Sequence, residues 1–253
     1  MSFHVIDHEQ GSIPWLRWRH DGIGGSDAPA LMGENPWRSA KALFAEKVAP
    51  SRYGAVRPAP PKAALSDLFA AAPVALNAAA AADVLNAAAA APVALNAAAA
   101  AGPKPPAPDQ RYRSAASRGT ALEPYARDLY NRHVGENLVP NCLESRDRPW
   151  QRVSLDGLCL KSGRVLEIKC GDKVYAHVAS TNKVPGYYIG QLQHILAVSG
   201  FAAIDFWVWL PGKPPLLLTV PRDEAYIDRL TALQADFWDR VLAARQISSA
   251  SRP

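Results

Sequence analysis

The order of hydrophobic and polar residues divides the chain into helix-like and strand-like segments. Apolar residues recur every three or four positions in some stretches and alternate or cluster in short runs in others. The pattern predicts helices over 26–33, 39–48, 120–133, 187–198 and 223–245, and strands over 138–143, 151–160, 165–170, 203–210 and 216–220. Ser26 and Ser39 are expected N-caps, and Gly163 is expected in the turn of a hairpin. This order of elements predicts an α/β or α+β domain, with a mixed central sheet flanked by helices.

The stretch 58–108 breaks this pattern. It contains APVALNAAAAA twice, at 72–82 and 91–101, and proline is frequent at both of its ends. Small apolar residues interrupted by proline cannot build a core, so we expect a low-complexity insertion. Removing its 51 residues leaves 253 − 51 = 202 residues, the size of one domain. We therefore expect a single domain over 1–253 with one insertion.

Composition and charge narrow the class of protein. The chain has 28 Lys and Arg against 23 Asp and Glu, a formal net charge of +5, which permits a polyanionic partner without requiring one. Three scattered cysteines are too few for a disulfide framework or a four-thiolate metal site. The first residues lack a basic and then apolar secretion signal, and no run is rich enough in Leu, Ile and Phe to predict a membrane span. We expect a cytoplasmic protein that does not bind membranes.

One pair of short motifs carries candidate chemistry. Asp156 lies in the first strand of the expected hairpin, and Glu167 and Lys169 lie two residues apart in the second. Side chains two apart on a strand share a face, so two carboxylates and an ammonium can converge. Oxygen ligands of this kind suit Mg²⁺, with Mn²⁺ as a substitute, and a lysine can orient or activate the attacking water in phosphodiester hydrolysis. The alternative is an exposed hairpin with paired charges, which the motif alone favours.

Side chains of the helix at 187–198 and several tryptophans have structural interpretations. Tyr188, Gln191 and His194 are three apart and are expected to form a polar stripe, opposite a buried stripe. His194 is expected on the helix surface. Trp207 and Trp209 share one face of the 203–210 strand and are expected in the core, with base-stacking platforms as the alternative. Trp37 is expected to pack beside Pro36, with an exposed wedge against DNA as the alternative.

Several motifs in order along the chain resemble the YqaJ-type viral recombinase family. This family includes the phage lambda-type 5′→3′ exonucleases of the PD-(D/E)XK nuclease superfamily. The motifs are GIGGSDAPALMGENPWRSAKALFAEK within 19–47, RGTALEPYARDLY at 118–130, SLDGLCL, RVLEIKC, PGYYIGQLQHILAVSG at 185–200, and FWVWLP. Leu155 stands where the superfamily motif has proline, and the alanine-rich insertion is a second departure.

The resemblance implies a set of metal ligands. It implies that Asp156, Glu167 and the backbone carbonyl of Ile168 bind metal, that Lys169 activates water, and that Glu123 contributes to the metal site directly or through water. Glu123 has a second interpretation, because Thr120-Ala-Leu-Glu123 also fits a helix capping box.

The resemblance also implies contacts with DNA. Arg19 and Ser26 match positions that hold the 5′-terminal phosphate, and Ser154 can add a hydroxyl to the same phosphate. Tyr188 and Gln191 match positions near the scissile phosphate. A glycine-rich turn before a helix and an arginine fork both suit an anion.

The function implied is a Mg²⁺-dependent 5′→3′ exodeoxyribonuclease. It would degrade one strand of double-stranded DNA from a 5′-phosphorylated end and leave 3′ single strands for phage-type recombination. The resemblance further implies a trimeric ring and a single-strand annealing recombinase as partner. The alternatives are a RecB-like or restriction-type endonuclease of the same superfamily, or a noncatalytic module that binds DNA ends.

Overall fold

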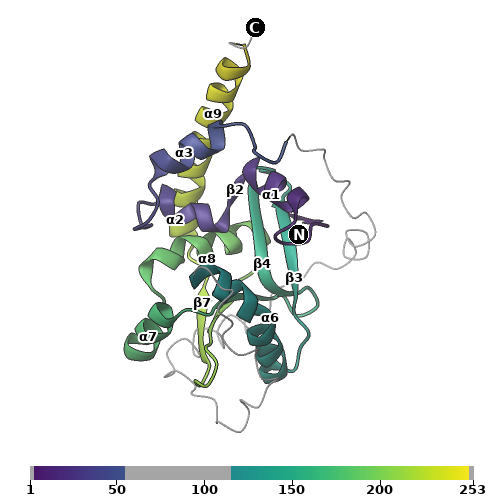
Figure 1. Ribbon diagram of the computed structural model, residues 1–253, viewed down its shortest axis with the longest axis vertical. Helices are drawn as coiled ribbons and strands as arrows, with labels where there is room; N and C mark the ends of the chain where they lie inside the picture. The colour runs from purple at the N-terminus through teal and green to yellow at the C-terminus, as the bar shows by residue number, and fades with distance from the viewer. Residues whose placement is uncertain (1–2, 55–114, 251–253) are drawn as a thin grey trace.

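A mixed sheet forms the centre of the fold (Figure 1). The computed structural model describes residues 3–54 and 115–250. Its seven strands run in the order β1-β3-β4-β5-β6-β7, with β2 paired to β4, and the β2–β4 and β5–β6 pairs are parallel while the others are antiparallel. The strands are β1 Phe3–Ile6, β2 Ile23–Gly24, β3 Val139–Ser145, β4 Gln151–Cys159, β5 Arg164–Lys169, β6 Ala203–Val208 and β7 Leu216–Pro221. The expected mixed sheet flanked by helices is confirmed.

Helices cover both faces of the sheet. Within the described residues they are α1 Ile13–His20, the 3₁₀ turn η1 Gly25–Asp27, α2 Ala28–Leu31, α3 Ala40–Val48, α6 Ala115–Val134, α7 Asp172–Thr181, α8 Gly186–Ser199 and α9 Glu224–Ala250. Alternate residues of β6 show the layering, because Phe206 packs with residues of α7 and α8 while Trp207 packs with α6. The core is therefore divided by the sheet into two apolar layers.

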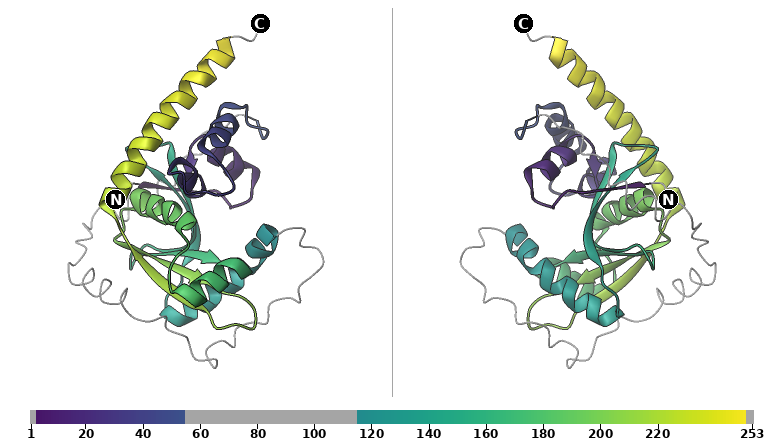
Figure 2. Two further views of the ribbon diagram at one scale, coloured as in Figure 1. Left: turned by 90° about the vertical axis from the view of Figure 1, so that its left-hand side faces the viewer. Right: turned by 90° about the vertical axis from the view of Figure 1, so that its right-hand side faces the viewer.

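A smaller apolar cluster joins the N-terminal segment to the C-terminal helix. Ile23, Ala30 and Leu43 pack against Phe237 and Trp238 of α9. Figures 1 and 2 show α9 running past α2 and α3 and extending beyond the rest of the fold. This cluster holds β2, α2 and α3 against α9, next to the part of the sheet where β2 pairs with β4.

The structure confirms the expected hairpin and revises several helix boundaries. β4 and β5 are antiparallel neighbours, and Gly163 in their turn has a φ of +71°. Ser39 caps α3, since its Oγ accepts the N–H of Ala42 at 3.2 Å. The N-cap prediction for Ser26 is wrong, because η1 begins at Gly25 and the Ser26 hydroxyl is bound by an arginine instead. The pattern also missed β1, α1, β2 and α7.

The aromatic and histidine predictions have mixed outcomes. Trp207 and Trp209 are buried, as expected. Trp37 is 73% exposed, which agrees with the alternative of an exposed ring and not with a ring packed away beside Pro36. His194 is fully buried and not on the helix surface, because its ring contacts the Arg152 carbonyl oxygen and Gln234.

Two expectations concern the rest of the chain. The low-complexity insertion expected at 58–108 lies outside the described residues, so the single-domain arrangement stays a prediction. No helix in the described ranges is both long and apolar enough to cross a membrane.

Candidate active site

The candidate acids stand where two strands of the hairpin separate. Backbone pairing between β4 and β5 runs from Cys159–Arg164 to Gly157–Leu166. A methyl group on Gly157 would lie 3.1 Å from atoms of Leu138 and Leu166, so a side chain there would press against both leucines. Asp156 and Glu167 come next along the two strands, directly after the last pair. The hairpin register therefore places them at the same opening.

Glu167 is held by two polar side chains. Its Oε1 accepts hydrogen bonds from the Lys169 ammonium and, at 2.6 Å, from the Gln191 amide on α8. Lys169 Nζ also lies 4.9 Å from the centre of the Tyr188 ring, a cation–π distance. The second carboxylate oxygen of Glu167 is buried without a hydrogen-bond partner. A buried carboxylate oxygen left in this state is costly unless a cation or donor binds it.

Asp156 points across the opening to the backbone of β5. Its Oδ2 accepts the N–H of Ile168 at 2.8 Å, and its own carbonyl accepts from Arg127 at 2.9 Å. The N–H and C=O of a strand residue point to the same side. The Ile168 carbonyl therefore faces the opening where β4 no longer pairs with β5.

Glu123 reaches the same cavity from α6. The capping-box interpretation is wrong, because α6 begins at Ala115 and Thr120 lies inside the helix, with Pro124 also in its interior. Glu123 lines a cavity of about 180 Å³ together with Asp156 and Glu167. The structure thus brings together the acids that the sequence singled out.

Burial and mutual repulsion perturb these acids. Burial, followed by the charge of Asp156, raises the pKa of Glu123 to about 7. Burial also raises the pKa of Glu167 to about 7, although Lys169 opposes the shift, and it raises the pKa of Asp156. Burial disfavours the Lys169 ammonium, but the carboxylates of Glu167 and Asp156 hold its pKa above the usual range. In the protein alone, Lys169 is therefore protonated, and its single positive charge does not compensate the carboxylates of Glu123, Asp156 and Glu167.

These features fit a divalent cation. Asp156, Glu167, Glu123 and the Ile168 carbonyl offer the oxygen donors that Mg²⁺ and Mn²⁺ prefer. The unpartnered Glu167 oxygen and the raised carboxyl pKa values are both relieved by a cation. As the side chains stand, no three His, Cys, Asp or Glu side chains within the described ranges are already arranged around one point as a ligand set. The acids share a cavity, and a cation would draw them together.

Hydrogen-bonding side chains line the other end of the cavity. We call this group, which consists of Trp15, Arg19, Ser26 and Ser154, the donor cradle. Arg19 donates to the Ser26 hydroxyl at 2.7 Å, and its guanidinium lies 4.6 Å from the centre of the Trp15 ring. Trp15 in turn donates to the Ser154 hydroxyl at 2.7 Å. Each hydroxyl accepts from the protein and so keeps its own O–H available to donate. A methyl group on Gly24 would lie 3.8 Å from the Arg19 guanidinium, so glycine leaves this space open.

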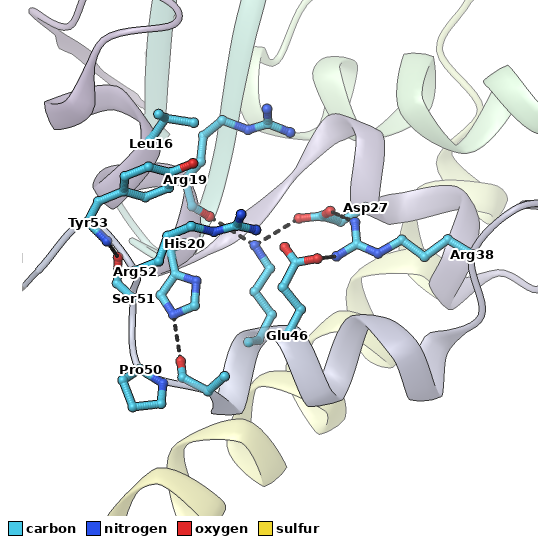
Figure 3. A pocket seen from close by; sticks show the side chains of 12 residues that line it. Leu16, Arg19, His20, Asp27, Arg38, Glu46, Pro50, Ser51, Arg52 and Tyr53 are labelled. Carbon is cyan, nitrogen blue, oxygen red and sulfur yellow. Dashed lines mark hydrogen bonds and ion pairs between the residues drawn. The ribbon is translucent and has the colours of Figure 1, made fainter.

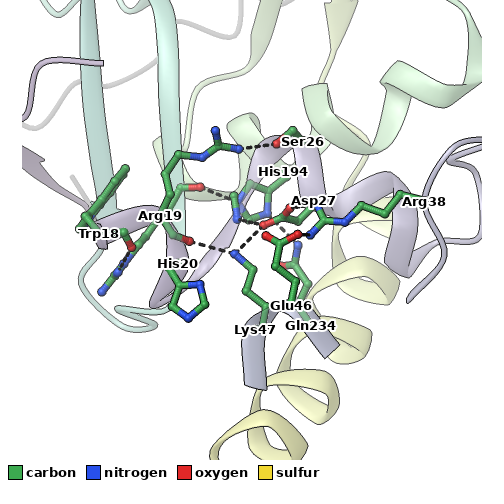
Figure 4. A network of polar contacts seen from close by, with 12 residues as sticks. Trp18, Arg19, His20, Ser26, Asp27, Arg38, Glu46, Lys47, His194 and Gln234 are labelled. Atoms are coloured by element: carbon green, nitrogen blue, oxygen red, sulfur yellow. Dashed lines mark hydrogen bonds and ion pairs between the residues drawn. The ribbon is translucent and has the colours of Figure 1, made fainter. Parts of the chain in front are cut away.

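A buried ion pair holds the cradle in place (Figure 4). Lys47 Nζ lies 3.0 Å from Asp27 Oδ2 and donates to the Arg19 carbonyl at 2.9 Å. Asp27 also accepts the Gly24 N–H at 3.0 Å and pairs with Arg38 at 2.9 Å. Burial would raise the pKa of Asp27, but the charges of Lys47 and Arg19 hold it at about 2. The two residues fix the backbone on both sides of the donor cradle.

A larger cavity lies on the other side of Arg19 (Figure 3). It measures about 390 Å³ and is lined by Asp27, Glu46 and Lys47 among others. Its acids are already paired, since Arg38 bridges Asp27 and Glu46. The smaller cavity is therefore the better candidate, because it holds the unpartnered Glu167 oxygen and the open cradle.

Comparison with known proteins agrees with this architecture. The model of the YqaJ-like viral recombinase domain matches residues 14–202, about three quarters of the chain. The chain belongs to the YqaJ-like viral recombinase family. The match includes both the donor cradle and the acid cluster. No curated protein matches the chain.

Solved structures share the fold of this YqaJ-like chain. An alkaline exonuclease from Laribacter hongkongensis, LHK-Exo, superposes with a TM-score of 0.64 at 19% identity, over 94% of this chain and 97% of that one. LHK-Exo in complex with dAMP gives a TM-score of 0.61, with the same identity and coverage.

The structure adds residues to the YqaJ-like site that the sequence reasoning missed. Trp15 contacts the Ser154 hydroxyl. Gln10 contacts the Leu155 carbonyl, and Arg127 contacts the Asp156 carbonyl. Two of them carried a weak signal, because Trp15 lies four residues before Arg19 and Arg127 four after Glu123, one helical turn away in each case. Gln10 lies outside the helices and strands and left no such signal.

Proposed function

We propose that this chain is a metal-dependent 5′→3′ exodeoxyribonuclease that degrades one strand of duplex DNA from a 5′-phosphorylated end. The observation that carries the proposal is the single cavity that joins the Asp156, Glu167 and Lys169 cluster to the Arg19 cradle. An acid cluster alone would suit any phosphodiesterase. A donor cradle beside it supplies a place for a terminal phosphate, which is what an enzyme acting from an end requires.

Each group has a role that follows from its contacts. Arg19, Ser26 and Ser154 hold the 5′-phosphate through charge-assisted hydrogen bonds. Asp156, Glu167 and the Ile168 carbonyl, with Glu123, hold Mg²⁺ or Mn²⁺, which would polarise the scissile phosphate and neutralise developing charge. Gln191, Tyr188 and Lys169 act around these ligands. Gln191 orients Glu167, and Tyr188 keeps the Lys169 ammonium in place.

Lys169 has the task of positioning and proton transfer. Its ammonium is held by Glu167, and a cation that compensates this carboxylate would lower the pKa of Lys169. A lysine with a lowered pKa can orient the attacking water and accept its proton. The protein alone keeps this amine protonated, so the activity is expected to depend on added metal.

Similarity to the two solved structures of LHK-Exo supports this proposal. The fold is shared with LHK-Exo, whose description is an alkaline exonuclease. LHK-Exo has also been solved with dAMP, a deoxynucleoside monophosphate of the class that stepwise cleavage from a DNA end releases. The trimeric ring, the annealing recombinase and the cytoplasmic location stay predictions.

The first experiment tests the acid cluster on end-labelled linear duplex DNA with Mg²⁺. Lys169→Ala and Asp156→Asn are expected to lower the cleavage rate by about 10²-fold or more. Lys173→Ala and Asp128→Asn are matched controls, since both residues are exposed and lie outside the cavity. Degradation at the wild-type rate by both active-site variants would refute the site.

The second experiment tests polarity and end dependence. The wild type is expected to degrade 5′-phosphorylated ends faster than 5′-hydroxyl ends, and Arg19→Ala is expected to remove most of that preference. A relaxed circular plasmid should stay intact. Cleavage of the circle would favour the restriction-type alternative, and binding of ends with no cleavage under any metal would favour the noncatalytic one.

A further inference from the structure

Trp37 is an exposed tryptophan in a structured loop. Among the described large hydrophobic side chains that are exposed, it has the highest exposed fraction, 73%, and is the only aromatic one. The loop is held by Asn35, whose side-chain oxygen accepts the N–H groups of Trp37 at 2.9 Å and Arg38 at 3.0 Å. An indole kept in water by a fixed backbone suggests a contact surface.

The ring continues into a row of aromatic side chains that leads to the candidate active site. Trp37 meets Tyr187 edge-to-face, with centroids 4.8 Å apart, and Tyr187 contacts Tyr188 at 4.6 Å. Tyr188 is the ring against which the Lys169 ammonium lies, at 4.9 Å. Three contacts therefore connect the exposed indole to an amine in the acid cluster.

We propose that Trp37 and Tyr187 form a stacking platform for a nucleobase of the DNA strand that enters the cavity. This rests on the proposed function, since it assigns the platform to the same substrate. A base is flat and aromatic, so it matches an exposed indole whatever its sequence. Two rings are also far too small for a stable protein interface, which buries more than about 1,000 Å².

The test is a binding titration that requires no cleavage. Fluorescence anisotropy of the full chain in EDTA measures its affinity for a labelled 5′-phosphorylated duplex with a short unpaired 5′ end. Trp37→Ala is expected to bind about tenfold more weakly, Trp37→Phe close to the wild type, and Leu242→Ala, an exposed site on α9, like the wild type. The salt dependence of binding should be unchanged, because stacking releases no counterions.

Abasic substitutions identify the stacked base. A series of duplexes carries one abasic residue at successive positions from the 5′ end. At one position, the abasic residue is expected to weaken wild-type binding as much as the Trp37→Ala substitution does. The same abasic residue should not weaken binding by Trp37→Ala any further, since both changes remove the same contact. A Trp37→Ala penalty that persists with every abasic duplex would overturn the proposal.

Other occupants of the platform would give different results. If Trp37 contacts a second copy of the chain, Trp37→Ala will lower the mass measured by light scattering and leave the affinity per protomer unchanged, which refutes the nucleobase. Failure of the nuclease proposal is separate. It would appear as wild-type cleavage by Asp156→Asn, whereas the titration reports on Trp37 without any cleavage.

Discussion

Replacing Lys47 with methionine is expected to destabilise the fold by about 3 kcal/mol. Methionine keeps much of the aliphatic volume but removes the ammonium that contacts Asp27 Oδ2 and the Arg19 carbonyl. Breaking a buried ion pair from one side costs about 3–5 kcal/mol, because the partner charge stays buried. The lower end applies here, since Arg38 and the Gly24 N–H still bind Asp27.

The pKa directions of the pair predict how the loss can be recovered. The pKa of Asp27 is held at about 2, but burial lowers the pKa of Lys47 despite the nearby carboxylate. The ion pair favours the charged form of Asp27, whereas burial disfavours the charged form of Lys47. The 3.0 Å separation of their charged atoms shows that the pair is formed. Removing both charges in Asp27→Asn with Lys47→Met should therefore cost less than the sum of the two single changes.

Urea unfolding followed by circular dichroism, with thermal unfolding as a second measurement, checks this prediction. A loss of about 3 kcal/mol lowers Tm by about 6–12 °C in a domain of this size. Because the folded-state pKa of Asp27 is below its usual 3.8, its ionisation stabilises the fold above about pH 4, and this contribution is lost as pH falls toward 2. The difference between wild type and Lys47→Met should narrow over the same range. A change in Tm below about 1 °C, or a double variant as unstable as the sum, would refute the reasoning.

Three further predictions concern packing, protonation and the cradle. Gly190→Ala should destabilise by about 1–3 kcal/mol in urea unfolding, because its Cβ would lie 3.0–3.1 Å from Pro29 and Tyr226. Gly186→Ala, with open space, should change stability by less than about 1 kcal/mol. Without divalent cations, the raised pKa of Glu167 makes the unfolding free energy fall as pH rises from about 4.5 to 7, and Glu167→Gln should reduce this slope. At pH 8, Mg²⁺ at 100 times its Kd should add about 2.7 kcal/mol to the wild type and less to Glu167→Gln. Gly24→Ala should leave Tm within about 2 °C but reduce the preference for 5′-phosphorylated ends several-fold in the cleavage assay.

The proximity of Asp156, Glu167 and Lys169 could be predicted because it follows from local geometry, whereas their assignment to a metal site came from the family resemblance. Two strands joined by a short turn have a register that the turn determines, so Asp156 and Glu167 had to meet once the hairpin formed. Side-chain alternation then put Lys169 on the face of Glu167. The hairpin, the central sheet and the long helices came from periodicities of the same local kind.

The errors have both local and distant causes. Ser26 looked like an N-cap, but Arg19 reaches it from the preceding helix. The Thr120 motif looked like the start of a helix, but α6 begins five residues earlier, at Ala115. His194 was expected in water, but α9 covers it with Gln234. Of these, only Gln234 lies beyond the window of about 11–18 residues over which periodicity is recognised. The other two errors are local, because a side-chain contact replaces the expected cap and the helix starts before its capping motif.

The helix α8 sets the spacing between the two halves of the site. On one side its Gln191 amide binds Glu167 in the acid cluster. On the other side, Gly25 of the cradle turn packs so closely that its missing Cβ would lie 3.4 Å from Gln191 Cγ. One residue thus contacts both the turn that carries Ser26 and the carboxylate expected to hold the metal. In the proposed exonuclease, the distance from terminal phosphate to scissile bond would determine how many nucleotides are released in each step, and we expect the contacts of Gln191 with both halves to help set that distance.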